Sequence, residues 1–128
     1  MALQAYYREE LIALALIATG GFAGSVLHFW ITGVGQALPG TLLVNTLGSL
    51  LMGIFMYETI SFGQFSRRAR MLIGVGFLGA FTTFSGLALI AVQEPPLNAV
   101  IYVATTLALG LFAVCTGRTI VYHIHGRG

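Results

Sequence analysis

The chain has 128 residues, of which six are Lys or Arg and four are Asp or Glu, and its mean hydropathy is +0.90. A soluble domain of this length needs far more charged residues to cover its surface. The low charge also excludes the broad basic face that nucleic-acid binding requires, so we expect no nucleic acid among the partners.

Four largely uncharged stretches are long and apolar enough to cross a bilayer, which takes about 20 residues. They cover residues 11–32, 41–59, 71–93 and 97–122, and short connections join them. We therefore predict an all-α membrane protein in which residues 1–128 form a single four-span membrane domain. A cleavable signal peptide is the alternative for the first stretch, but Arg8 is followed there by two glutamates and not by further basic residues.

The arginines gather on one side of the predicted membrane. They lie before the first stretch, between the second and third, and at the end of the fourth, whereas the connection at residues 93–96 carries only Glu94. By the positive-inside rule, both termini face the cytoplasm. We expect a multi-pass protein of the inner (plasma) membrane.

The first stretch carries Gly20 and Gly24, a spacing that lets two helices approach closely. His28 follows four residues later on the same face, so this face should pack against protein. His28 is either a hydrogen-bonded residue near the helix end or part of a proton relay. No carboxylate in the interior of any stretch supports the relay.

In the second stretch, Asn45 shares a face with Gly48, Ser49 and Gly53. An amide in hydrocarbon is unfavourable unless it is hydrogen-bonded. Asn45 therefore either bonds to a neighbouring helix, as is common in membrane bundles, or offers its NH₂ group to an anion.

The third stretch contains the most polar segment at membrane depth, residues 79–85, with the sequence GAFTTFS. Lipid cannot hydrogen-bond to a loosened backbone, so a break there survives only against protein or a cavity. We expect the third helix to be broken at mid-membrane, so that hydroxyls and free carbonyls face something small that crosses.

The fourth stretch presents Tyr102, Thr106, Gly110 and Ala113 along one face. Taken alone, the Thr106 hydroxyl is expected to bond back to its own helix. Taken with the polar groups of the second and third stretches, it belongs to an interior of mostly neutral donors.

This interior also includes Phe81 and Phe84, whose ring edges carry the positive end of the aromatic quadrupole. Neutral donors and ring edges suit a small, strongly hydrated anion, which must lose its water without being trapped. The pattern therefore indicates an ion pathway.

Residues for enzymatic chemistry are missing from the sequence. It contains no nucleophile–base pair, no phosphate-binding loop and no Cys-x-x-Cys cluster, and His123 and His125 are close to the C-terminus. Cys115 is the single cysteine and should only pack within its helix. We do not expect an enzyme.

Four sequence words lie in order, one in each stretch or leading into it: GGFAGSVLHF (20–29), GTLLVNTLGS (40–49), GFLGAFTTFS (76–85) and TLALGL (106–111). They resemble the signatures of the Fluc (CrcB) family of fluoride ion channels, across essentially the whole chain. The resemblance implies a fluoride-selective channel that exports cytoplasmic fluoride passively. It also implies an antiparallel dimer in membrane lipid, with two pores between the subunits.

At the matching positions, the resemblance implies that Asn45 hydrogen-bonds fluoride and that Phe84 offers its ring edge. It implies that other pore positions are Thr83, Ser85, Thr106 and Tyr102. It further implies a structural Na⁺ at the centre of the dimer, bound by the backbone carbonyls of Gly79 and Thr82. Carbonyl oxygens suit such a hard cation.

Two residues depart from the family pattern. Leu87 stands where the family has a second phenylalanine, so one ring edge is missing from the pathway. His28 stands where the family has an arginine, which removes a permanent charge near the pore mouth. These departures leave a subunit that assembles without conducting as one alternative.

The arginine asymmetry is a third departure, because an antiparallel homodimer needs a chain that inserts in both directions. A chain with a fixed orientation would instead pair with an oppositely oriented homologue in a heteromeric fluoride channel. A small proton-coupled multidrug exporter is a further alternative, but such transporters need a membrane-embedded carboxylate that residues 11–32 do not supply.

Overall fold

The computed structural model describes residues 2–34 and 37–125, and the regular elements within them are helices. In chain order these are α1 (Ala2–Val34), α2 (Ala37–Tyr57), η1 (Glu58–Phe62), α3 (Arg67–Ala69), η2 (Arg70–Leu78), α4 (Gly79–Phe81), α5 (Phe84–Gln93) and α6 (Pro96–His125). The two η elements are π-helical and have a wider turn than the α-helices that flank them.

Four helical segments are long and apolar enough to cross a membrane. They are Tyr6–Gly33, Leu38–Phe62, Arg67–Gln93 and Pro96–His125. Each contains one of the four stretches predicted from the sequence, which confirms an all-α chain with four membrane-length helices. The first and last helices run past the predicted bounds because charged and polar residues end an apolar pattern without ending a helix.

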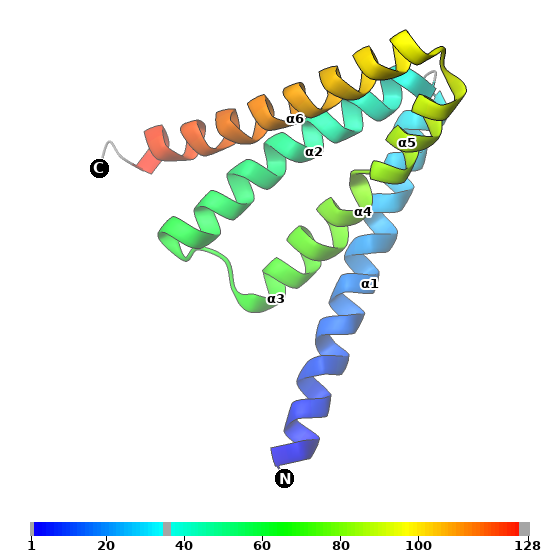
Figure 1. Cartoon of the computed structure of the whole chain (residues 1–128). Helices are drawn as coiled ribbons and strands as arrows, with labels where there is room; N and C mark the ends of the chain where they lie inside the picture. Colours follow the sequence, from blue (N-terminus) through cyan, green and yellow to red (C-terminus); the bar gives the residue numbers. More distant parts are fainter. Residues whose placement is uncertain (1, 35–36, 126–128) are drawn as a thin grey trace.

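The helices form two pairs that diverge from the end of the molecule where α5 lies (Figure 1). In one pair, α1 packs along η2 and α4; in the other, α2 packs along α6. The N-terminus of α1 and the C-terminus of α6 therefore lie far apart (Figure 1).

Glycine allows the backbones within each pair to approach closely. A Cβ atom at Gly20 would overlap the carbonyl oxygen of Leu72, and a Cβ atom at Gly24 would overlap that of Phe77. Gly53 of α2 lies equally close to the backbone of α6. The prediction that the Gly20–Gly24 face packs against protein is therefore confirmed.

A small apolar cluster attaches α5 to the other half of the molecule. Leu87 and Ile90 of α5 are buried against Tyr102 of α6, with Leu42 and Val103 packed around them. Since η2 and α4 lie on α1 while α5 lies on α6, the third segment passes from one helix pair to the other between α4 and α5.

Candidate functional site

The third segment is interrupted between α4 and α5 by two residues in extended conformation. Thr82 has φ −86° and ψ 155°, and Thr83 has φ −143° and ψ 124°. Thr83 then caps α5, because the Gly86 N–H donates to Thr83 Oγ1 at 2.9 Å. The hydroxyl of Ser85 lies 3.2 Å from the same Oγ1 atom.

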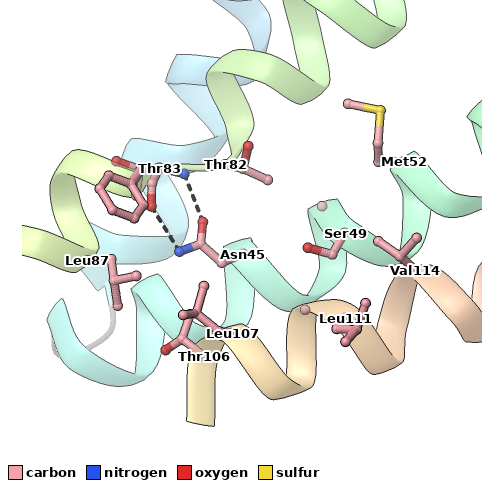
Figure 2. A pocket seen from close by; sticks show the side chains of 13 residues that line it. Asn45, Ser49, Met52, Thr82, Thr83, Leu87, Thr106, Leu107, Leu111 and Val114 are labelled. Atoms are coloured by element: carbon pink, nitrogen blue, oxygen red, sulfur yellow. Dashed lines mark hydrogen bonds between the residues drawn. The ribbon is translucent and has the colours of Figure 1, made fainter. Parts of the chain in front are cut away.

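Asn45 of α2 pairs with the backbone of Thr83 through both ends of its amide (Figure 2). Asn45 Nδ2 donates to the Thr83 carbonyl oxygen at 2.9 Å, and the Thr83 N–H donates to Asn45 Oδ1 at 2.8 Å. One side chain therefore satisfies both polar groups of a residue that has left the helix, as buried backbone requires in lipid.

His28 of α1 bonds to the last residue before the break. Its Nδ1 lies 2.8 Å from the carbonyl oxygen of Phe81. A carbonyl can only accept a hydrogen bond, so Nδ1 carries the proton. In a continuous helix this carbonyl would accept from the Ser85 N–H, so His28 replaces a donor that the break removes. Of its two interpretations, the structure favours the hydrogen-bonded one.

Two other carbonyls at the break lose their helical donors to side chains. In a continuous α-helix, the Thr83 N–H would donate to Gly79 and the Gly86 N–H would donate to Thr82. Here these N–H groups donate to Asn45 Oδ1 and to Thr83 Oγ1. The carbonyls of Gly79 and Thr82 are thereby released from the helical pattern.

A groove with a volume of about 480 Å³ opens beside the break. Its walls come from α2, from residues 82–87 and from α6. The lining residues are Asn45, Gly48, Ser49, Met52, Thr82, Thr83, Phe84, Leu87, Thr106, Leu107, Gly110, Leu111 and Val114. None of these described residues is charged.

Polar groups concentrate at one end of this groove. Figure 2 shows Asn45 beside Thr83 at that end, Ser49 one turn further along α2, and Met52 with Val114 at the opposite end. The groove therefore changes from polar near the break to apolar away from it.

Comparison of the sequence with known proteins identifies the family of this chain. Residues 15–118 match the family model described as CrcB-like protein, Camphor Resistance (CrcB). The chain belongs to the CrcB family.

Individual relatives in this family are similar over most of their length. The chain is 40% identical over 107 residues to fluoride-specific ion channel FluC 1 of Methanospirillum hungatei, covering 84% of this chain and 76% of the relative. It is 35% identical over 119 residues to fluoride-specific ion channel FluC 2 of Methanosarcina barkeri, covering 93% and 94%. It is 42% identical to fluoride-specific ion channel FluC of Shewanella sp. strain ANA-3, covering 85% and 95%.

The structure brings most of the pore residues suggested by the CrcB resemblance to one groove. Asn45, Thr83, Phe84 and Thr106 line it, and so does the departure Leu87. The hydroxyl of Thr106 donates to the Tyr102 carbonyl at 2.8 Å and so bonds back to its own helix. The Leu87 side chain is only 3% exposed, since it also belongs to the apolar cluster with Tyr102.

Three of the suggested residues lie elsewhere. Tyr102 is buried behind the groove wall, where its hydroxyl donates to the Leu38 carbonyl at 3.2 Å. Ser85 is outside the lining and contacts it only through Thr83. Gly79 is exposed one turn before the break, and a Cβ there would meet only Gly74 O at 3.9 Å.

Other lining residues were not singled out from the sequence, although helical spacing could have found them. Met52 lies seven residues after Asn45 on α2, and Val114 lies four residues after Gly110 on α6. The helix face of Asn45 reaches Met52 after two turns, and the face of Gly110 reaches Val114 after one turn. An apolar side chain in a membrane helix gives no sign in the sequence that it lines a pathway for an ion.

Backbone carbonyls and hydroxyls are the candidate oxygen ligands for a cation near this site. Within residues 2–34 and 37–125, no three His, Cys, Asp or Glu side chains come together as a metal site. The released carbonyls of Gly79 and Thr82 fit a hard monovalent cation, which prefers neutral oxygen ligands.

Proposed function

We propose that this chain is a subunit of a fluoride channel through which cytoplasmic fluoride leaves the cell passively. The observation that carries the proposal is the groove at the Asn45–Thr83 junction, whose lining is uncharged and polar at one end. The relatives named fluoride-specific ion channels support the choice of ion.

The groove offers neutral groups that can replace water around a small anion. Asn45 keeps one Nδ2 hydrogen beyond the one donated to Thr83. Phe84 is 77% exposed on the isolated subunit, and its ring edge is the positive end of the quadrupole. A pathway built from such groups lowers the cost of dehydration without holding the ion as a full charge would.

A second subunit is needed to enclose the pathway. The groove is open along the side of this subunit, and the two helix pairs diverge. We infer an antiparallel dimer with two pores, in which the Thr82–Thr83 break lies at mid-membrane. The position of the break supports this depth, since it falls near the middle of the segment Arg67–Gln93.

A structural Na⁺ at the centre of this dimer would be held by the carbonyls of Gly79 and Thr82 from each subunit. Both carbonyls have lost their helical donors, and Gly79 lies on an exposed part of the subunit. When bound, the ion would offset the negative partial charge of these carbonyl oxygens.

A heteromeric channel is the second candidate. Leu87 gives the groove an aliphatic side chain in place of a ring, and the arginines favour one orientation. An oppositely oriented homologue in the inner (plasma) membrane would supply the aromatic ring and the opposite orientation that this chain lacks. The numbers 1 and 2 in the names of relatives from Methanospirillum and Methanosarcina fit organisms that have more than one such chain.

Fluoride efflux from liposomes containing only the purified chain tests the proposal. A fluoride electrode should record efflux that starts when valinomycin provides a K⁺ shunt, because passive movement of an anion builds up a voltage. Chloride-loaded vesicles serve as the control for selectivity. Efflux without the shunt, or efflux driven by a pH gradient alone, would contradict a passive channel.

Cysteine labelling separates the homodimer from the heteromer. A single cysteine is placed within residues 61–66 of a Cys115→Ala variant, because Cys115 is exposed and would otherwise react. Labelling from the cytoplasmic side alone indicates one orientation and a heteromeric channel. Equal labelling from both sides of the membrane indicates a dual-topology homodimer.

A further inference from the structure

The two hydrogen bonds of the Asn45 amide have different consequences for the broken helix. Asn45 Oδ1 accepts the Thr83 N–H, which in a continuous helix would belong to the Gly79 carbonyl. We propose that Asn45 is the positioning residue of the break: its Oδ1 atom keeps the Gly79 carbonyl available to a cation, while its NH₂ group serves the anion. This inference rests on the proposed channel function.

Asn45 Oδ1 can keep the Gly79 carbonyl available because the two oxygens compete for the same N–H donor. Asn45 Oδ1 and the Gly79 carbonyl are alternative acceptors for the Thr83 N–H, since a half-buried N–H in lipid must be paired. Without an acceptor at position 45, the pairing available to Thr83 is the helical one. Re-forming that bond would close the break and occupy the Gly79 oxygen.

The second bond fixes the orientation of the amide. Because Asn45 Nδ2 donates to the Thr83 carbonyl at 2.9 Å, the carboxamide cannot rotate without losing both bonds. The fixed plane leaves the remaining Nδ2 hydrogen for the groove that Asn45 lines. One side chain thereby links the geometry of the anion pathway to that of the cation site.

Two substitutions separate these roles. Asn45→Asp keeps an oxygen that accepts the Thr83 N–H but removes the NH₂ group and places a negative charge beside the anion pathway. Asn45→Leu removes both the acceptor and the donor at similar size. Thr116→Val is the control, because Thr116 lies outside the groove and its hydroxyl bonds only within α6.

The experiment measures two quantities on each full-length variant in detergent and in liposomes. The first is the shift in melting temperature and in the dimer fraction when N-methyl-D-glucamine is replaced by Na⁺. The second is fluoride efflux. For Asn45→Asp we expect efflux to fall about tenfold or more while the Na⁺-dependent shift persists. For Asn45→Leu we expect both to be lost, and for Thr116→Val both to be retained.

The outcomes distinguish this inference from the proposed function. A full Na⁺-dependent shift in Asn45→Leu, its loss in Asn45→Asp, or no shift in the parent chain would overturn the positioning role. A parent chain that responds to Na⁺ but passes no fluoride would contradict a channel formed by this chain alone and leave the positioning role standing. If Asn45→Leu does not assemble in either salt while Asn45→Asp does and responds to Na⁺, the acceptor oxygen accounts for the difference and the proposal is supported.

Discussion

Helix α6 and the break in the third segment both carry hydroxyl and amide groups at membrane depth, but they use them differently. In α6, the hydroxyls of Thr106, Thr116 and Thr119 each donate to the carbonyl four residues earlier at 2.8 Å. At the break, Asn45 and His28 bond to the backbone of another segment. These threonines of α6 are therefore neutral to the fold, whereas the polar residues at the break replace a missing part of a helix.

The largest effect should come from closing the space beside the break. In Gly48→Val, the new side chain would overlap Thr82, and its Cβ would lie 3.2 Å from the Phe81 ring. We expect a destabilisation of about 3 kcal/mol and loss of both assembly and efflux. Gly33→Val is the matched control, since no atom lies within 4 Å of a Cβ there. Gel filtration and fluoride efflux provide the measurements, and equal behaviour of the two variants would contradict a tightly packed break.

The next largest effect is expected for Gly79→Val, which should impair dimer assembly but not the folding of a single subunit. A Cβ at Gly79 meets only Gly74 O at an ordinary contact distance of 3.9 Å, so Gly79→Val should still fold and insert. We expect the dimer and its Na⁺ response to be lost, because the side chain would project from an exposed part of the subunit that the proposed dimer interface covers.

Thr82→Ser provides the comparison for this variant. It keeps the hydroxyl that donates to the Leu78 carbonyl at 3.0 Å and should behave like the parent. Crosslinking in membranes measures the dimer fraction of both. Normal dimers in Gly79→Val would show that the cation site lies elsewhere.

A smaller effect should follow from removing the hydrogen bond between His28 and the Phe81 carbonyl. His28→Ala leaves the Phe81 carbonyl without its donor, and we expect a loss of about 1–3 kcal/mol in stability with a reduced efflux. Thr19→Ala on the same helix removes a bond to its own helix, from Thr19 Oγ1 to the Ala15 carbonyl, and should change little. Denaturant unfolding in detergent compares the two. Similar losses would mean that bonds between segments matter no more than bonds within a helix.

The smallest effect is expected in α6. Thr116→Val removes a hydroxyl that bonds only to Phe112 of its own helix, and Thr116 does not line the groove. Stability should change by less than about 0.5 kcal/mol and efflux by less than about twofold. A large loss of efflux in this variant would mean that hydroxyls of α6 take part in conduction.

The helices and their glycine contacts were predictable because both depend on local pattern. Four apolar stretches gave four membrane-length helices, and the spacing of Gly20 and Gly24 identified the face that packs on η2. The segment of residues 79–85 located the two extended threonines, since polar residues beside glycine at membrane depth need a partner.

The partners of the polar side chains were not predictable from a single sequence. Asn45 and Thr83 are 38 positions apart, and nothing in either stretch specifies that one amide would bond both polar groups of one residue. The position of Tyr102 also depends on tertiary packing, because α5 turns Leu87 and Ile90 onto it and thereby separates it from the groove. Both features arise where the third segment passes between the helix pairs.

The released carbonyls also bear on the lifetime of a newly made subunit. Before a partner arrives, Gly79 is exposed on the subunit and its carbonyl lacks its helical donor. An unsatisfied polar group in hydrocarbon raises the free energy by several kcal/mol, which favours partly opened states that membrane proteases recognise. The cellular abundance of this chain would therefore follow the supply of its partner, so that unassembled copies are removed before they accumulate in the bilayer.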